Sequence, residues 1–211
     1  MSADAFPVLV MRLRAAGIAD SGVLRALEGV DRAAYVAAED RRRAWSDQVL
    51  PLPCGQATER LDDLAAMIAA LEVEPHHRVL DVGTGSGFAA AVLSRLAARV
   101  VTVERYRTLL RAARERHVRG GHGNIEYALR DGTEPPDGDV PLDRVLFTVA
   151  LPEPPRHFID RLAPDGVIVA PIGGEGEADI MRLRRVGARF ERQKVGRGWF
   201  ATAERGRALA L

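Results

Sequence analysis

The sequence has little that could hold the chain together covalently or anchor it in a membrane. Cys54 is the only cysteine among 211 residues, so no internal disulfide can form, which fits a reducing compartment. No apolar run approaches the ~18 residues that a membrane-spanning helix needs. The N-terminus also lacks a basic segment followed by an apolar one. We therefore expect an unexported, cytoplasmic protein without a membrane partner.

An excess of charge of one sign is missing as well. The chain has 30 lysine and arginine residues against 29 acidic residues, which leaves a formal net charge of +1. A nearly neutral chain has no overall field that would draw it onto a polyanion. The arginines are dispersed and form no basic tract with interleaved aromatic residues. The sequence therefore does not support nucleic-acid binding, and it gives no indication of oligomeric state.

The histidines and the single cysteine do not form a metal-binding pattern. His76 and His77 are adjacent, and adjacent histidines rarely chelate one ion together, so we interpret them as a solvated turn. The other three lack the spacing of metal ligands: His117, His122 and His157. Cys54 has no evident partner base that would make it a nucleophile. We therefore predict no metal site.

Apolar periodicity predicts a helical beginning. Residues 6–45 carry apolar side chains at helical spacing, with a break at Asp20–Ser21 where a new helix is expected to begin. Residues 46–57 are rich in proline and glycine and are expected to form a loop. An amphipathic helix is predicted over Glu59–Leu71.

From residue 78 onward, short apolar strands alternate with helices. Strands are expected at 78–82, 100–103, 125–129, 142–148 and 166–171, and helices at 88–98, 108–119 and 155–162. This alternation implies parallel pairing with right-handed crossovers. The last segments resemble strands joined by short turns: 179–186, 189–195 and 198–201. The predicted fold class is α/β, with a mostly parallel sheet, helices on both faces, antiparallel strands at the C-terminal end and a helical N-terminal extension.

These patterns divide the chain near residue 57. Residues 1–57 are expected to form the helical extension and a loop that pack on the core. Residues 58–211 are expected to form the α/β domain, and the two parts together are expected to be one structural unit.

The segment Asp81–Gly87 carries the most chemical information. It joins an apolar strand to a helix through Gly83, Gly85 and Gly87, with the spacing G-x-G-x-G rather than the G-x-G-x-x-G of dinucleotide sites. Glycine permits positive φ and a close approach of the backbone to a ligand. Ligands of open α/β sheets bind beyond the carboxyl ends of the strands. A glycine-rich turn beside surface acids is the alternative interpretation.

Two further acids follow strands of the same predicted sheet. Glu104 ends the second strand, 21 residues after Gly83, where a carboxylate can accept hydrogen bonds from ribose hydroxyls. Asp131 and Gly132 follow the third strand. A strand, a glycine turn, a helix and two strand-end acids together favour a nucleotide-containing cofactor.

This arrangement resembles the first motif of the Rossmann-like S-adenosylmethionine-dependent methyltransferases. The resemblance implies that S-adenosylmethionine is the cofactor and that the glycine loop lies against its methionine part. An acid after the third strand meets the adenine amino group in that family. The residues that would bind the cofactor are Asp81, Gly83, Thr84, Gly85, Ser86, Gly87, Glu104, Asp131 and Gly132.

Two segments before the glycine loop indicate which family of these methyltransferases the sequence resembles. Residues 30–36 read VDRAAYV and residues 50–56 read LPLPCGQ. They are similar to the V-x-R-x-x-[FY]-V and L-P-I-x-x-G-Q-T elements of the protein-L-isoaspartate O-methyltransferases. The resemblance implies methylation of the free carboxylate of isoaspartyl residues in damaged proteins, a repair reaction. Isoaspartyl-containing proteins or peptides would be the partners.

The loop that would face the methyl acceptor departs from this family, because Glu59 stands where an active-site serine is expected. A serine hydroxyl can donate to a carboxylate, whereas an ionised glutamate cannot. Two negative charges ~4 Å apart repel by several kcal/mol at an effective dielectric near ~20. Thr58 can supply a hydroxyl if the loop shifts, and Arg60 can pair with Glu59 or with the acceptor.

The candidate catalytic residues are therefore Thr58 and Glu59, and the candidate substrate-binding residues are Gln56 and Arg60. Three alternatives stay open. Thr58 can cap the following helix, with Glu59 and Arg60 as ordinary first-turn residues. Glu59 can act as a general base for a neutral nucleophile of a different acceptor. The chain can also be a family member that binds the cofactor without catalysing.

Overall fold

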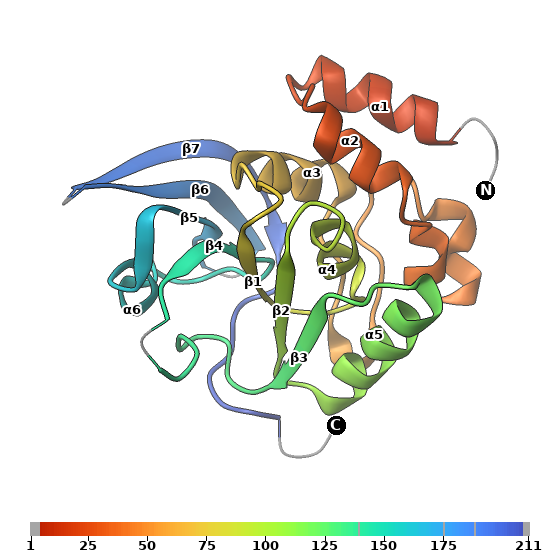
Figure 1. Ribbon diagram of the computed structural model, residues 1–211. Helices are drawn as coiled ribbons and strands as arrows, with labels where there is room; N and C mark the ends of the chain where they lie inside the picture. Colours follow the sequence, from red (N-terminus) through yellow and green to blue (C-terminus); the bar gives the residue numbers. More distant parts are fainter. Residues whose placement is uncertain (1–4, 139, 175, 188, 209–211) are drawn as a thin grey trace.

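The computed structural model describes residues 5–138, 140–174, 176–187 and 189–208. Within these residues a seven-stranded sheet has the order β3-β2-β1-β4-β5-β6-β7 (Figure 1). Its strands are β1 (Arg78–Val82), β2 (Arg99–Glu104), β3 (Ile125–Leu129), β4 (Leu142–Phe147), β5 (Leu162–Ile172), β6 (Gly176–Val186) and β7 (Arg189–Phe200). The pairs within β1–β5 are parallel, whereas β6 and β7 pair antiparallel. The predicted fold class is confirmed.

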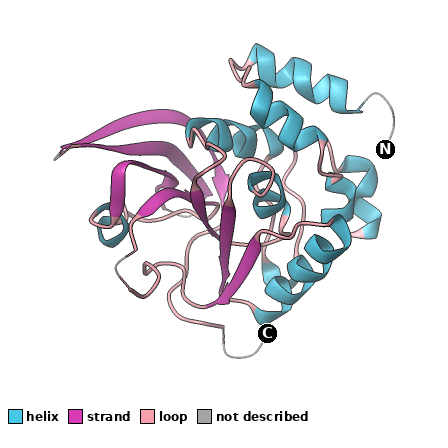
Figure 2. Cartoon of the chain, in the orientation of Figure 1, coloured by secondary structure: helices cyan, strands magenta, loops and turns pink. Residues whose placement is uncertain are grey.

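Helices cover the two faces of the sheet unequally (Figure 2). They are α1 (Ala5–Ala15), α2 (Ser21–Glu28), α3 (Leu61–Ala70), α4 (Phe88–Leu93), α5 (Arg107–Gly120) and α6 (Arg156–Ile159), with short 3-10 helices at Arg32–Tyr35, Ala38–Arg43 and Pro53–Gly55. One face packs against α3 and α4, and the other receives Phe158 of α6 and Ala203. Among the described helices, none is long and apolar enough to cross a membrane.

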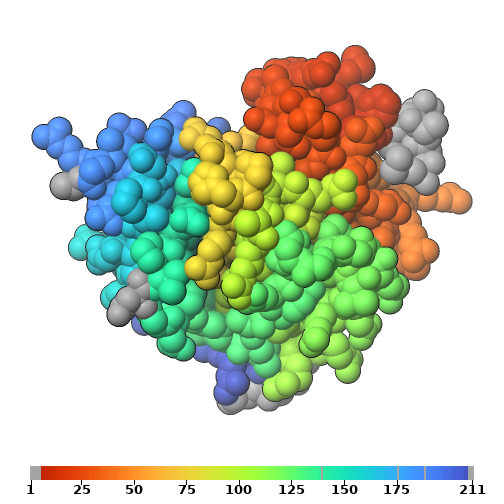
Figure 3. Space-filling model, viewed as in Figure 1, coloured from red at the N-terminus to blue at the C-terminus, as the bar shows by residue number. Residues whose placement is uncertain are grey.

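The N-terminal helices share the core of the sheet. Helices α1 and α2 pack on α3, and α2 also packs on α4. Leu9 and Leu27 belong to the same buried apolar cluster as Leu64 and Phe88. In the space-filling view the first helices (red) lie directly against the yellow and yellow-green segments that follow α3 and α4 (Figure 3). The division of the chain at residue 57 stays a prediction.

Several boundaries differ from those expected, and side-chain hydrogen bonds explain one of them. Helix α4 ends at Leu93 rather than at residue 98, because Asn124 Nδ2 donates to the carbonyls of Ser94 and Ala97 at 2.9 and 3.0 Å. These carbonyls therefore leave the helical ladder. Strand β5 begins at residue 162 and α6 is correspondingly short, with Asp165 at φ 59° bending the chain inside the strand. Helix α3 begins at Leu61, two residues later than expected.

Candidate functional site

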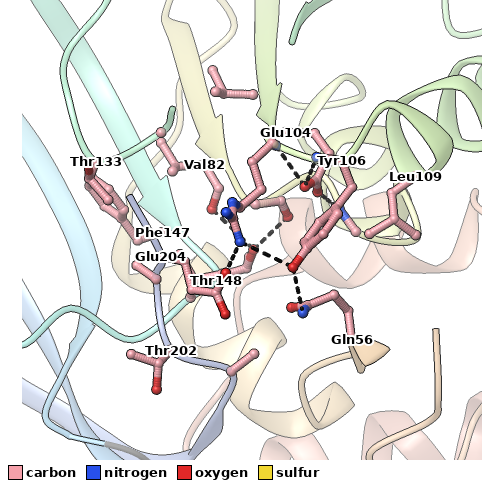
Figure 4. Close-up of a pocket in the computed structure, with 18 of the residues that line it drawn as sticks. Gln56, Val82, Glu104, Tyr106, Leu109, Thr133, Phe147, Thr148, Thr202 and Glu204 are labelled. Atoms are coloured by element: carbon pink, nitrogen blue, oxygen red, sulfur yellow. Dashed lines mark hydrogen bonds and ion pairs between the residues drawn. The ribbon is translucent and has the colours of Figure 1, made fainter. Parts of the chain in front are cut away.

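A cavity that is partly open to solvent lies beyond the carboxyl ends of β1, β2 and β4, and the space within it, open solvent included, is about 750 Å³. The crossover topology brings these strand ends together at the same edge of the sheet. Its walls come from five segments: residues 52–59, the glycine loop, residues 104–106, residues 132–133 and residues 147–151. Residues 201–204 close the remaining side. In Figure 4, side chains from most of these segments surround a common space.

The glycine loop presents its first half to this cavity. Gly83, Gly85 and Gly87 have φ values of 100°, 51° and 90°, as the predicted turn requires. Gly83 and Gly85 line the cavity, whereas Thr84, Ser86 and Gly87 are not among its lining residues. These three residues therefore shape the loop from behind.

Helix α5 supports the back of the loop. Arg116 Nη1 donates to the Ser86 carbonyl at 3.0 Å, and His117 Nε2 donates to the Gly87 carbonyl at 2.7 Å. Burial lowers the pKa of His117 to about 4, so the ring is neutral near pH 7. With its proton on Nε2, the ring accepts from the Tyr127 hydroxyl at Nδ1, 3.0 Å away. Sequence reasoning assigned His117 no role, because its partners are remote in sequence.

Asp81 lies beneath the loop and is fully buried. Its Oδ2 accepts from the Thr102 hydroxyl at 2.7 Å, and the Thr102 hydroxyl also bonds the Thr84 hydroxyl at 2.6 Å. Its Oδ1 has no hydrogen-bond partner among the described residues. Burial, together with the charges of Glu59 and Glu104, raises the pKa of Asp81 to about 7, and the hydrogen bond from Thr102 opposes this rise. The unliganded site therefore favours a protonated Asp81 more than water does.

Replacing Asp81 by asparagine is expected to remove the free-energy cost of ionising this buried carboxyl above neutral pH. Because the pKa of Asp81 in the folded protein, about 7, lies above the ordinary value of 3.8, ionising Asp81 costs stability as the pH rises from 4 to 7. The unfolding free energy of Asp81→Asn relative to the parent should therefore rise by about 2–3 kcal/mol from pH 5 to pH 8. Urea denaturation of the unliganded proteins measures this difference. Asp160→Asn, at an exposed position, is the control, and parallel curves for Asp81→Asn and the parent would contradict the prediction.

Glu104 ends β2 and reaches the rim of the cavity. Its Oε1 accepts from the backbone amides of Arg105 and Tyr106 at 2.8 and 3.0 Å, and its Oε2 accepts from the Gly85 amide at 3.0 Å. Burial raises the pKa of Glu104, whereas these three amides lower it. The carboxylate thus ties the glycine loop to β2, and its remaining lone pairs can accept from ribose hydroxyls.

The third-strand acid is arranged differently. Asp131 Oδ1 accepts from the Thr133 amide and hydroxyl at 2.8 and 2.7 Å, and its Oδ2 accepts from the Gly206 amide at 2.6 Å. These bonds lower the pKa of Asp131 against the opposing effect of burial. Gly132 and Thr133 line the cavity, whereas Asp131 is not among its lining residues. A Cβ at position 132 would lie 2.5 Å from Val82 Cγ1, so glycine keeps this wall close to β1.

The loop before α3 contributes two of the four predicted residues to the cavity. Gln56 and Glu59 line it. The Thr58 hydroxyl instead accepts from the Leu50 amide at 3.1 Å, and Thr58 lies outside the lining. Arg60 is exposed and forms an ion pair with Asp47. Because α3 begins at Leu61 with Arg60 as its N-cap residue, Thr58 does not cap this helix.

A buried arginine, Arg32, contacts Glu59 and is not among the residues that line the cavity. Arg32 Nη2 donates to the Glu59 carbonyl at 3.5 Å, and Arg32 lies over the Phe88 ring at 5.4 Å from its centroid. Burial lowers the pKa of Arg32 to about 10 and raises the pKa of Glu59, whereas their mutual attraction opposes both changes. No ion pair to the Glu59 carboxylate forms within the described residues. Glu59 is therefore a lining carboxylate without a bonded counterion.

The C-terminal segment adds residues that the sequence did not reveal. Arg105 forms an ion pair with Glu204, and its Nε donates to the Gly206 carbonyl at 3.0 Å. Arg105 Nη1 and Gln56 Nε2 both donate to the Tyr106 hydroxyl, at 3.1 and 3.5 Å (Figure 4). The position of Arg105 directly after Glu104 is the one sequence signal for this network.

The adjacent histidines are only in part a solvated turn. His76 is exposed, but His77 is buried and its Nδ1 accepts from the Glu74 amide at 2.8 Å. The side chains of Glu74, His76 and His77 each place a potential ligand atom within 4.8 Å of the others. Since Nδ1 accepts, a neutral His77 carries its proton on Nε2 and has no free nitrogen lone pair for a metal. The interpretation of His77 as solvated was wrong.

Comparison with known proteins places this geometry in a family context. A family model described as protein-L-isoaspartate(D-aspartate) O-methyltransferase matches residues 6–207. A protein-L-isoaspartate O-methyltransferase 2 of Rhodopseudomonas palustris strain HaA2 is 44% identical over 186 residues, covering 88% of this chain and 86% of the relative. A protein-L-isoaspartate O-methyltransferase of Azorhizobium caulinodans is 45% identical over 176 residues, covering 83% and 80%.

A solved structure shares the fold at much lower identity. A Plasmodium falciparum chain, described as a protein-L-isoaspartate O-methyltransferase in complex with S-adenosyl-L-homocysteine, matches with a TM-score of 0.80 and 18% identity. The match covers 93% of this chain and 97% of that one. At this identity the likeness concerns the fold alone.

Proposed function

The chain belongs to the protein-L-isoaspartate(D-aspartate) O-methyltransferase family, and from this we propose that it transfers a methyl group from S-adenosylmethionine to isoaspartyl residues. The acceptor is the free carboxylate of an L-isoaspartyl residue in a damaged protein or peptide. The family uses S-adenosylmethionine as its cofactor. Protein repair is the corresponding biological role, in a cytoplasmic setting.

One observation supports the proposal most directly. The cavity joins Gly83 and Gly85 at one side, Glu104 at the end of β2, and Gln56 from the loop before α3. A glycine backbone admits the methionine part closely, and a strand-end carboxylate accepts from a ribose. Gln56 then faces the remaining space with an amide that can donate to an acceptor carboxylate.

For this reaction the protein mainly has to position the acceptor and the cofactor relative to each other. S-Adenosylmethionine, held by the glycine loop and Glu104, would supply a methyl group on a sulfonium sulfur, and the loop before α3 would hold an acceptor carboxylate oxygen in line with it, so that a C–O bond would replace the C–S bond and the sulfur would keep the electron pair. The products are a methyl ester and S-adenosylhomocysteine, and no proton needs to move. Alignment of the oxygen with the methyl group is therefore the main source of rate.

The loop residues have unequal support for roles at the acceptor. Gln56 and Glu59 line the cavity in the described arrangement, and we assign both to the site. Thr58 and Arg60 hold other partners, Leu50 and Asp47, so either would have to exchange these bonds to reach the acceptor. Asp131 acts on the cofactor in this proposal by orienting the wall formed by Gly132 and Thr133.

The proposal predicts methyl transfer to an isoaspartyl peptide and none to its normal aspartyl twin. Labelled S-adenosylmethionine and the two peptides test this directly, and methanol release reports the labile ester. Transfer to a different acceptor, with a base-stable product, would point to another substrate. Cofactor binding by calorimetry without any turnover would contradict an enzymatic role.

A further inference from the structure

Three carboxylates gather where the glycine loop leaves β1. Glu59 lines the cavity, Glu104 lies on its rim, and Asp81 lies buried beneath the loop with Oδ1 unpartnered. Glu104 is bonded by three backbone amides, so its charge is already stabilised. Glu59 and Asp81 have no comparable set of donors. An unpaired buried acceptor costs free energy until a donor reaches it, so this end of the cavity favours a cationic donor.

The position of Glu59 matches the methionine end of the cofactor. Asp81 precedes Gly83 by two residues, and the charge of Glu59 influences Asp81 more strongly than that of Glu104 does. Gly83 and Gly85 line the cavity together with Glu59. Gly132 and Thr133 also line the cavity, and Thr133 lies across it from Gln56 (Figure 4).

We propose that Glu59 binds the α-ammonium group of S-adenosylmethionine, together with Asp81, and is therefore a cofactor residue rather than an acceptor residue. The inference rests on the proposed function, because it takes the cavity as the cofactor site. The ammonium offers three N–H donors, and two carboxylates with free oxygens can accept two of them. Arg32, whose Nη2 donates to the Glu59 carbonyl, lowers the pKa of the Glu59 carboxyl against the larger, opposite effect of burial.

This assignment removes the conflict between Glu59 and a negatively charged acceptor. Once an ammonium lies between Glu59 and Asp81, the charge of Glu59 is balanced, and an acceptor carboxylate meets a site with little net repulsion. The amide of Gln56, which donates one N–H to the Tyr106 hydroxyl, has a second N–H that can orient the acceptor. Productive binding therefore requires the cofactor to bind before the isoaspartyl peptide.

The test compares two ligands that differ in the amino-acid part. S-Adenosylhomocysteine carries the α-ammonium, whereas 5′-methylthioadenosine lacks the whole amino-acid group. Titration calorimetry with Glu59→Gln is expected to show affinity for S-adenosylhomocysteine weakened about 10- to 100-fold, because a charge-assisted hydrogen bond is lost. Affinity for 5′-methylthioadenosine should stay within about twofold of the parent, which also shows that the variant is folded.

Two controls make the result specific. Glu204→Gln changes a second lining glutamate, which pairs with Arg105 instead of facing the glycine loop, and it should leave the ratio of the two affinities unchanged. Glu59→Asp keeps the charge on a shorter side chain and should lie between the parent and Glu59→Gln. Proton release on binding near pH 7, measured in buffers of different ionisation enthalpy, should be smaller in Glu59→Gln.

The possible outcomes separate this inference from the proposed function. A parent protein that binds neither ligand would overturn the proposed cofactor site itself. A parent that binds S-adenosylhomocysteine together with an equally tight Glu59→Gln would overturn only the role of Glu59. A Glu59→Ser variant that gains isoaspartyl activity with unchanged cofactor affinity would place Glu59 at the acceptor and would also overturn it.

Discussion

Replacing Glu104 by glutamine is expected to weaken S-adenosylhomocysteine binding about a hundredfold. The substitution removes charge-assisted hydrogen bonds and also places an NH₂ group against a buried N–H donor. In the parent, both oxygens accept from backbone amides: Oε1 from Arg105 and Tyr106, and Oε2 from Gly85. A glutamine must turn its NH₂ group toward one of these donors. The loop then moves away from β2, and one acceptor for the ribose is lost as well.

Titration calorimetry measures this loss, and Glu126→Gln serves as the matched control. Glu126 is an exposed glutamate on β3 that pairs with Arg99, so its replacement should leave the affinity unchanged. Thermal unfolding of unliganded Glu104→Gln shows how much of the effect comes from the loop itself. An affinity within threefold of the parent, which is less than ~1 kcal/mol, would mean that the ribose binds elsewhere.

Replacing Gly83 by alanine should damage the protein far more than the same change at Gly85. At Gly83 the φ of 100° lies outside the region that alanine tolerates, and a Cβ would lie 2.6 Å from Thr148 Oγ1 and 3.1 Å from Val149 Cγ1. Thr148 donates to the Gly83 carbonyl at 2.7 Å, so it cannot move without breaking that bond. We expect a loss of about 3 kcal/mol in unfolding free energy.

Gly85 supplies the matched control in the same loop. Its φ of 51° lies in the left-handed region that alanine can enter, and a Cβ there would meet Leu52 Cδ1 at an ordinary 3.4 Å. The expected cost is about 1 kcal/mol, the usual penalty for a left-handed non-glycine residue. Urea denaturation of both variants tests the difference. Equal losses at the two positions would show that crowding by Thr148 has no effect.

The sheet and the glycine loop could be predicted because their signals are local. Short apolar runs mark β1 and β2, and the three glycines between β1 and α4 mark a turn with positive φ that glycine adopts most easily. Glu104 and Asp131 are likewise found from their places at strand ends. In such cases a few neighbouring residues determine the local conformation, so the sequence alone contains the information.

Contacts between distant segments could not be predicted in this way. The pair of Arg105 and Glu204 joins residues 99 positions apart, and no periodicity links them. The Thr58 hydroxyl was a candidate because it stands near the expected serine, yet its direction depends on pairing with Leu50. His117 became informative only once α5 was placed against the loop. These positions are set by tertiary packing, for which a single sequence carries no direct signal.

The apolar cluster that runs from Leu9 through Leu64 to Phe200 has a consequence for engineering. The N-terminal helices and the sheet bury their apolar surfaces against each other, so neither part retains a complete core when separated. Residues 58–211 are consequently not expected to fold stably without the N-terminal helices. Chimaeras that exchange the first helices between relatives would have to exchange the facing surfaces of α3 and α4 with them.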